Sequence, residues 1–307
     1  MKILLTTTSF QDTPGQHQSL LYSKGFIIDK LRGPLTSDKL IPIIGDYDGI
    51  ICGDDEITKE VIDAGLNGNL KVISKYGIGL DKVDLIELKK TKLKIFNTPG
   101  VNNEAVAEHF FSLLLSFEKN ILQENKFIQS QKWTRLIGHE IYNKSIGIIG
   151  LGNVGKEIVK RAHAFGLKVH CYDIIYDLEF CEKYEVTCYD KIIDLYDKID
   201  YLSLNLPLNN FTKDIINKAA FNKFKSTIVI INTARAGLID EQCLINNLKK
   251  NKIRGYLTDV LNTEPMIDNH PLLEFDNVII TPHIGSRNHE TVARQGLAAV
   301  NNLLNNL

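Results

Sequence analysis

Hydrophobic and polar residues follow two patterns along this chain, which are short apolar runs and segments of helical period. In the first 98 residues, apolar runs predict five strands, separated by segments in which apolar residues recur every three or four positions. The expected strands are 2–8, 25–28, 48–52, 70–74 and 93–97, with helices at 36–44 and 58–66. Strands that alternate with helices in this way predict a compact, mostly parallel α/β unit.

A second alternation of strands and helices begins at residue 145. Its runs are nearly continuous in Ile, Val and Leu, which is typical of strands covered by helices on both faces of a parallel sheet. The expected strands are 145–150, 167–173, 199–205, 226–232, 253–260 and 277–282. A last amphipathic helix is expected at 287–306, from where the chain could return to cover the first unit.

The two alternations are joined by a segment that predicts one long helix over 102–129. Its apolar residues are too many for a single stripe: Val106, Phe110, Phe111, Leu114, Leu115, Phe117, Ile121 and Leu122. A helix that is apolar on more than one side is either buried in its own domain or packed against another subunit. The pattern leaves both possibilities open, and we expect a homodimer through this part of the chain.

Composition narrows the class of protein without naming a function. The chain has 307 residues, of which 44% are hydrophobic and 24% charged, with a formal net charge of −1. This length predicts two domains, and the charge balance gives no reason to expect nucleic acid or a membrane as a partner. Five cysteines without a CxxC pair favour a reducing cytoplasm, and eight histidines without an HExxH pattern argue against a metal site.

A glycine-rich turn lies between the expected strand 145–150 and an expected helix at 153–165. Gly150 permits a tight turn, Gly152 allows a diphosphate to approach the backbone, and Gly155 allows the helix to pack on the sheet. The diphosphate of a dinucleotide would then lie at the N-terminus of the helix. Asp173, at the end of the next strand, can accept hydrogen bonds from a ribose and would repel a 2′-phosphate, which favours NAD over NADP. A structural turn that binds nothing and a site for S-adenosylmethionine are the alternatives.

Four residues that could carry out hydride-transfer chemistry follow the later strands. Oxidation of a hydroxy acid requires a cation for the carboxylate, an acid/base for the hydroxyl proton and a group that orients the acid/base. Arg235 offers a bidentate guanidinium, and His283 titrates near neutral pH. Asp259 ends a strand, and Glu264 follows in its loop, where it could fix the tautomer of His283.

Several motifs in the same order resemble the D-isomer-specific 2-hydroxyacid dehydrogenases, a family that includes phosphoglycerate dehydrogenase and glyoxylate reductase. The motifs that carry this resemblance are KYGIGLDKVD (75–84), NTPGVNNEAVAEH (97–109), GLGNVG (150–155), NLPLNNFT (205–212), NTARAGLID (232–240), DVLNTEP (259–265) and TPHIG (281–285). They extend over nearly the whole chain.

The resemblance implies a role for each matching residue. Arg235 would bind the substrate's carboxylate and carbonyl, His283 would be the general acid/base, and Glu264 would be its partner. Asp259 would contact the nicotinamide carboxamide. The further cofactor-binding residues would be Gly150, Gly152, Asn153, Val154, Gly155, Asp173, Pro207, Thr212 and Thr233. The substrate-binding residues would be Lys75, Tyr76, Gly77, Ile78, Gly79 and Arg235, with the backbone around Tyr76–Gly79 holding the substrate carboxylate.

The resemblance also implies a fold with two doubly wound parallel-sheet domains. A Rossmann domain that binds NAD, residues 99–286, would be inserted into a flavodoxin-like substrate domain formed by residues 1–98 and 287–307. The implied reaction is hydride transfer between NAD(H) and a D-2-hydroxy acid or 2-keto acid. A non-catalytic corepressor that senses NAD is a remote alternative.

The sequence does not determine which group the substrate carries beyond its 2-hydroxy or 2-keto acid. The chain is most like phosphoglycerate dehydrogenases, with glyoxylate or hydroxypyruvate reduction as the alternative. Asp54, Asp55 and Glu56 lie in a loop where many phosphoglycerate enzymes have an arginine, and acids there would disfavour a phosphate. Lys75, Arg32 or Arg135 could compensate for them.

Overall fold

The computed structural model describes residues 1–307 and divides into two compact units. Unit 1 comprises Met1–Asn102 and Arg287–Leu307, and unit 2 comprises Asn103–Ser286. The first boundary therefore follows residue 102, whereas the sequence suggests residue 98. The intervening residues stay with unit 1 because Thr98 donates its backbone N–H to Gly77 and Val101 accepts a hydrogen bond from Arg294.

Unit 1 contains a sheet of five parallel strands in the order β2-β1-β3-β4-β5. This is the flavodoxin-like order that the resemblance implies. Side chains on β1 alternate between the two faces: Ile3 and Leu5 enter one apolar core, and Leu4 enters the other. The strands are β1 (Lys2–Leu5), β2 (Ile27–Lys30), β3 (Gly49–Cys52), β4 (Val72–Lys75) and β5 (Lys94–Phe96).

Helices cover both faces of this sheet. The C-terminal helix α12 (His289–Leu304) packs against β4 and α2, so the last segment of the chain completes unit 1. Ser74 on β4 fixes the contact because its hydroxyl donates to the backbone carbonyl of Ala299 at 2.7 Å. The other helices are α1 (Thr8–Asp12), α2 (Gln16–Tyr22), α3 (Ser37–Leu40), α4 (Lys59–Leu66) and α5 (Leu85–Leu88), with a 3₁₀ turn η1 (Ile44–Asp46).

Unit 2 contains a sheet of seven parallel strands in the order β12-β11-β10-β9-β6-β7-β8. The strand order reverses between β6 and β9, which is the topology of a Rossmann domain. The pair Thr187–Cys188 adds an edge strand, β8, which the sequence does not reveal because two exposed residues carry no pattern. The strands are β6 (Ser145–Ile149), β7 (Lys168–Tyr172), β8, β9 (Tyr201–Leu204), β10 (Val229–Asn232), β11 (Gly255–Thr258) and β12 (Val278–Ile280).

Two apolar cores, one on each face of the sheet, hold the helices of unit 2. One contains Phe110 and Ile158 from α6 and α8, and the other contains Phe221 and Leu244 from α10 and α11. The helices are α6 (Asn103–Glu118), α7 (Ile121–Gln129), α8 (Asn153–Ala164), α9 (Leu178–Lys183), α10 (Lys218–Lys223) and α11 (Glu241–Lys249). Three 3₁₀ turns accompany them, η2 (Ile192–Asp194), η3 (Ala236–Leu238) and η4 (Pro271–Glu274). Both parallel-sheet domains expected from the sequence are confirmed.

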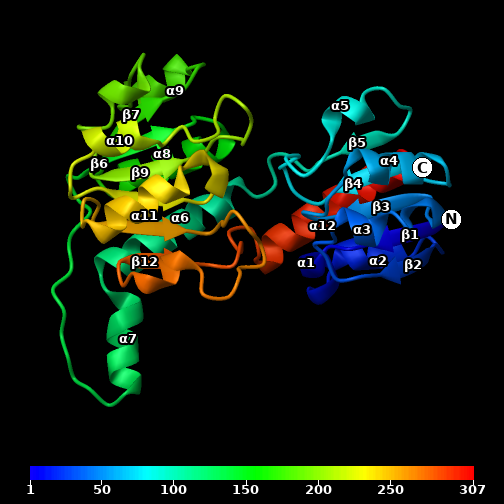
Figure 1. The fold of residues 1–307 in the computed structure, drawn as a ribbon, viewed down its shortest axis with the longest axis horizontal. Helices are drawn as coiled ribbons and strands as arrows, with labels where there is room; N and C mark the ends of the chain where they lie inside the picture. The colour runs from blue at the N-terminus through cyan, green and yellow to red at the C-terminus, as the bar shows by residue number, and fades with distance from the viewer. The chain divides into compact units, whose positions relative to one another are not determined.

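The single long helix expected over 102–129 is wrong. Asn120 adopts a left-handed conformation, with φ of 54°, and divides the segment into α6 and α7. Most apolar residues of α6 are buried, whereas no residue of α7 is, and α7 extends away from the sheet of unit 2 (Figure 1). No helix in the structure has the length and apolar character needed to cross a bilayer.

Candidate active site and nucleotide-binding site

Three of the predicted residues follow neighbouring strands of the unit 2 sheet. Arg235 follows β10, Asp259 directly follows β11, and His283 follows β12. Because these strands are parallel and adjacent, their carboxyl ends meet at one edge, where ligands bind in open α/β sheets. The sheet therefore places Arg235, Asp259 and His283 on the same edge of unit 2.

His283 forms the contact with a carboxylate that the sequence analysis suggests. Its Nδ1 lies 2.7 Å from Oε2 of Glu264, and the other oxygen of Glu264 accepts the Leu261 backbone N–H at 2.8 Å. A carboxylate partner assigns the proton of neutral imidazole to Nδ1, so that Nε2 is the basic nitrogen. His283 has a φ of 54°, which an L-residue adopts at a cost, so the loop holds this side chain against a local preference.

The loop that carries Arg235 is fixed by Asn232, the last residue of β10. The fully buried amide of Asn232 donates to the backbone carbonyl of Arg235 at 2.9 Å and accepts the backbone N–H of Ala234 at 3.0 Å. The guanidinium of Arg235 donates from Nη1 to the Ala234 carbonyl at 2.8 Å. Asn232 was not singled out from the sequence, although its place in NTARAG, three residues before Arg235, is a visible signal.

Asp259 is buried and holds the loop that contains His283. Its carboxylate accepts hydrogen bonds from Thr281 Oγ1 at 2.6 Å and from the backbone N–H groups of Ile284 and Gly285 at 2.9 and 2.7 Å. His109 of α6 lies 3.3 Å away and also contacts Thr281. Burial raises the pKa of Asp259, but the hydrogen bonds from His109 and Thr281 outweigh it, so that the pKa lies below its usual value. Asp259 is therefore ionised and positions the 281–285 loop. The sequence analysis did not single out His109 or Thr281.

The glycine-rich turn has the backbone geometry that a dinucleotide requires. Gly150 has a φ of 96°, and a Cβ on Gly155 would lie 2.2 Å from the carbonyl oxygen of Gly150, so neither position accepts a side chain without rearrangement. A Cβ on Gly152, in contrast, would meet nothing within 4 Å, and no side chain caps the first turn of α8. The first N–H groups of α8, which include those of Asn153 and Val154, therefore have no side-chain cap and can donate to a diphosphate.

The remaining predicted cofactor residues lie in the loops after β7, β9 and β10. Asp173 follows β7, and its carboxylate accepts the backbone N–H of Leu151 within the glycine turn and that of Ile174. Each carboxylate oxygen has a second lone pair, so Asp173 can still accept from a ribose. Thr212 donates to the carbonyl of Pro207 at 2.6 Å, which closes the loop after β9. Thr233 lies in the loop after β10 that Asn232 holds, next to Ala234.

In unit 1, the predicted substrate residues follow β4. Lys75, its last residue, is only 3% exposed and forms an ion pair with Asp54 at 2.7 Å, and its ammonium also donates to the carbonyl of Gly53. Gly77 has a φ of 131°, a conformation that favours glycine, and donates its N–H to Thr98 Oγ1 at 3.0 Å. Ile78 is 39% exposed, and its carbonyl accepts the side-chain amide of Asn97.

The acidic loop of unit 1 does not present three carboxylates to a ligand. Asp55 is 1% exposed and accepts hydrogen bonds from Thr6 Oγ1 and from the N–H groups of Leu35 and Gly53, at 2.7 to 2.8 Å. Glu56 accepts the N–H of Ser37. Asp54 is paired with Lys75, and Arg32, which the sequence offered as a compensating cation, is paired with Asp12 at 2.6 Å. The cations and acids of this loop region largely neutralise each other.

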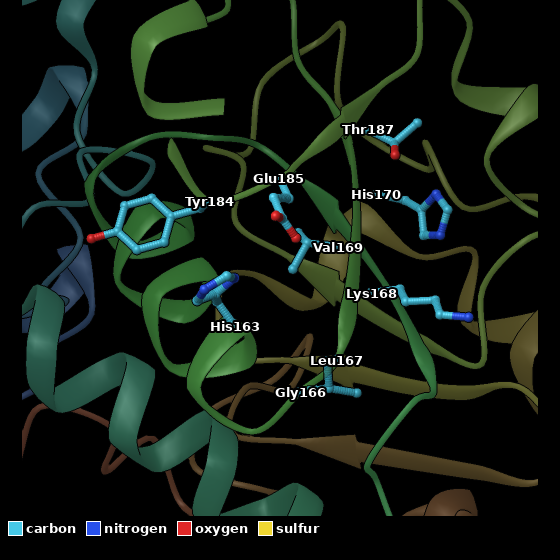
Figure 2. Close-up of a pocket in the computed structure, with 9 residues that line it drawn as sticks. All are labelled: His163, Gly166, Leu167, Lys168, Val169, His170, Tyr184, Glu185 and Thr187. Atoms are coloured by element: carbon cyan, nitrogen blue, oxygen red, sulfur yellow. The ribbon is translucent and has the colours of Figure 1, made fainter. Parts of the chain in front are cut away.

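One pocket of unit 2 lies away from all of these residues. It has a volume of about 360 Å³, and Figure 2 shows its lining side chains, among which are His163, Lys168, Tyr184 and Glu185. His163 lies in the last turn of α8, and Lys168 begins β7, so the pocket is at the opposite end of these elements from the glycine turn. None of the predicted site residues lines it.

Comparisons with known proteins agree with this arrangement. Residues 111–285 match the family model described as D-isomer specific 2-hydroxyacid dehydrogenase, NAD binding domain. A hydroxypyruvate reductase of Thermotoga maritima is 36% identical over 89% of this chain and 89% of its own length. A D-3-phosphoglycerate dehydrogenase of Methanocaldococcus jannaschii is 36% identical over 85% of this chain, which spans 50% of that protein. The crystal structure of the TT0316 protein from Thermus thermophilus is similar, with a TM-score of 0.88, 29% identity and coverage of 99% and 96% of the two chains.

Proposed function

Because this chain belongs to the D-isomer specific 2-hydroxyacid dehydrogenases and is an NAD-dependent oxidoreductase, we propose that it reduces a small, unphosphorylated 2-keto acid to the D-2-hydroxy acid. The observation that carries this proposal is the contact between His283 and Glu264, on the sheet edge that also carries Arg235 and the glycine turn. That edge brings a proton donor and a carboxylate-binding cation to one side of a dinucleotide-binding domain.

His283 is the proposed general acid/base. In reduction, the imidazolium donates the proton from Nε2 to the carbonyl oxygen as that oxygen gains negative charge, and in oxidation Nε2 accepts the hydroxyl proton. Glu264 keeps the ring in orientation and stabilises the imidazolium through Nδ1. Asp259 fixes the backbone on both sides of this ring through Thr281 and Ile284, and is thus a positioning residue.

A side-chain guanidinium and a segment of backbone are proposed to orient the substrate. Arg235 binds its carboxylate and carbonyl through the guanidinium, and the backbone of Tyr76, Gly77, Ile78 and Gly79 binds the carboxylate. NAD, held by the glycine turn, the N-terminus of α8 and Asp173, supplies the hydride donor and acceptor when it is bound. The remaining predicted cofactor residues, Pro207, Thr212, Thr233 and Asp259, are proposed to contact NAD from the loops after β9, β10 and β11.

The charge pattern of unit 1 supports an unphosphorylated substrate. Lys75, which lies among the predicted substrate residues, is paired with Asp54, so it contributes no uncompensated charge for a phosphate. Oxidation of phosphoglycerate is the second candidate, favoured by the two guanidinium groups of Arg32 and Arg287 on the single carboxylate of Asp12.

A panel of keto acids tests the proposal. Purified protein is mixed with NADH and with glyoxylate, hydroxypyruvate, pyruvate or phosphohydroxypyruvate, and absorbance of NADH is followed. We expect the highest kcat/KM with an unphosphorylated acid. A higher value for phosphohydroxypyruvate would establish the second candidate instead, and no oxidation of NADH with any of the four would overturn the proposed activity.

We also propose that the enzyme is a cytoplasmic homodimer joined through unit 2. Exposed apolar side chains cluster on α7 and the segment after it: Ile121, Leu122, Ile128, Trp133, Ile137 and Tyr142 are 50–95% exposed. Such a patch is typical of a protein interface. Light scattering should give twice the chain mass, and I137D combined with W133S should give the monomer. All five cysteines are unpaired, which agrees with a reducing compartment.

A further inference from the structure

Two cysteines of unit 2 lie in contact with each other and have no role in the site described so far. Cys181 lies on α9 and Cys188 on β8, and their Sγ atoms are 3.5 Å apart. Both thiols are free. Because the sulfurs of a disulfide are about 2 Å apart, an approach of about 1.5 Å is sufficient to join this pair.

The two thiols differ in their access to solvent. Cys188 is exposed, whereas Cys181 is only 5% exposed and packs in an apolar core of unit 2. Cys171, which is the register partner of Cys188 on β7, is fully buried. An oxidant in solution therefore reaches Cys188 first, and Cys181 is the neighbouring thiol that can react with it afterwards.

A tight connection holds the two cysteines together. They are seven residues apart, and the N–H of Val186 donates to the carbonyl of Cys181 at 2.8 Å. Glu185 supports this turn with a left-handed conformation, φ 52°. Two reacting groups that are held in contact by the fold react as if each were present at very high concentration. The second step of disulfide formation is thereby favoured over release of the first product.

Hydrogen bonds connect the pair to the proposed nucleotide site. Tyr189 follows Cys188, and its carbonyl accepts the hydroxyl of Tyr176 at 2.7 Å. The same hydroxyl accepts the backbone N–H of Asp173 at 3.0 Å. The carboxylate of Asp173 in turn holds the N–H of Leu151 in the glycine turn. A shift of β8 relative to α9 is therefore transmitted to the residue proposed to bind the ribose of NAD.

We propose that Cys181 and Cys188 are a modification site, at which a low-molecular-weight disulfide such as glutathione disulfide produces an intramolecular disulfide that weakens the binding of NAD(H). The approach of the two sulfurs displaces Tyr176 and Asp173 from the positions they have in the reduced protein. The inference requires that the protein binds NAD, and it does not depend on the proposed reaction.

The modification proceeds by two exchange steps. The thiolate of Cys188 attacks one sulfur of glutathione disulfide, which forms a mixed disulfide and releases one glutathione thiolate. The thiolate of Cys181 then attacks the Cys188 sulfur, which forms the intramolecular bond and releases the second glutathione. The two protein thiol protons pass to the two released thiolates. The protein pair thus loses two electrons, and glutathione disulfide is reduced to two glutathione molecules.

Oxidation of the purified protein tests the proposal. Desolvation and the hydrogen bond to Cys181 raise the pKa of the Cys188 thiol, so the reduced protein is incubated with glutathione disulfide at mildly alkaline pH, where more thiolate is present. Two thiols per chain should be lost, and mass spectrometry of peptides should find Cys181 joined to Cys188. The Kd for NADH, measured by fluorescence, should rise about tenfold and return to its original value with dithiothreitol.

Three results would overturn the inference: no loss of thiols, a disulfide between Cys188 and Cys171, or an unchanged Kd in protein that carries the mapped bond. Because the readouts are thiol content and NADH binding, they stand whether or not any keto acid is reduced. A failure of the proposed function is therefore distinguishable from a failure of this inference.

Three variants separate the pair from other thiols. C188S removes the exposed thiol at a position where serine fits, and glutathione disulfide should leave its NADH affinity unchanged. C181S should accumulate a mixed disulfide of Cys188 with glutathione in place of the intramolecular bond. C243S is the matched control, because Cys243 of α11 is a partly exposed thiol outside the pair, and it should respond as the natural chain does. A loss of affinity in oxidised C188S equal to that of the natural chain would contradict the proposal, even if C181S does not fold.

Discussion

The two parallel sheets of this protein differ at the point where their strand order reverses. In unit 2 this point lies between β6 and β9, and the turn after β6 leaves open space above Gly152. In unit 1 it lies between β1 and β3, where the buried carboxylate of Asp55 accepts hydrogen bonds from Thr6 and from the N–H groups of Leu35 and Gly53. Ligands of open α/β sheets bind at such points. In unit 2 the backbone there leaves room for a ligand, whereas in unit 1 an acid of the chain itself takes up the backbone N–H groups of Leu35 and Gly53.

The same strand topology therefore has different polar groups at its reversal point in the two units. Burial raises the pKa of Asp55, while hydrogen bonds from Thr6 and from two backbone N–H groups oppose that change and satisfy the carboxylate. Asp55 thereby links three loops of unit 1. The proposed substrate residues of this unit, among them Lys75 and Gly77, lie instead at the end of β4. We therefore expect substitutions in unit 2 to change turnover and NADH binding, and those in unit 1 to change the choice of substrate.

The largest effect should come from His283 in unit 2. H283A removes the proposed acid/base, and kcat should fall by at least about a hundredfold, the lower end of what such catalysis contributes. Binding of NADH, followed by its fluorescence, should persist because the glycine turn is unaltered. H163A is the matched control: this histidine lies at the far end of α8, lines the pocket in Figure 2, and should not affect kcat. Full turnover by H283A would remove the imidazole from the mechanism.

A smaller effect is expected at two of the three glycines of the unit 2 turn, Gly152 and Gly155, and it should separate folding from binding. In G152A the methyl group enters open space, so the melting temperature should hold while the Kd for NADH rises by about tenfold, or roughly 1.4 kcal/mol. In G155A the methyl group would collide with the Gly150 carbonyl, so the melting temperature should fall as well. Unchanged NADH affinity in G152A would show that the diphosphate does not approach this turn.

Periodicity was sufficient to predict most of the fold. The runs of Ile, Val and Leu locate the strands because a parallel sheet buries both of its faces, as the placement of Ile3 and Leu4 in opposite cores shows. Two features could not be found in this way. The break at Asn120 depends on one left-handed residue within an apolar pattern that continues, and β8 is too short to have a period.

The sequence predicts those residues of the candidate site that have suitable chemistry and also follow a strand. His283, Glu264 and Arg235 follow successive strands and have complementary chemistry, and the expected contact between His283 and Glu264 is present. The supporting residues were not found, because Asn232, His109 and Thr281 act through contacts between segments distant in the sequence. Asp55 was expected to repel a phosphate, yet it is buried, since a carboxylate can be satisfied by backbone N–H groups that no pattern reveals.

The smallest effect should come from Asp54 in unit 1. D54N leaves the charge of Lys75 uncompensated, so the proposed substrate residues at the end of β4 gain about one positive charge and should accept a phosphate better. Because Asp54 is partly exposed, solvent screens the change, and we expect the ratio of kcat/KM for phosphohydroxypyruvate to that for hydroxypyruvate to rise only about threefold to tenfold, less at high ionic strength. The control D63N breaks the exposed pair of Asp63 with Lys59 on α4 and should not change this ratio. An equal response to D54N and D63N would mean that Lys75 does not face the substrate, and that unit 1 selects the tail of the keto acid by some other group.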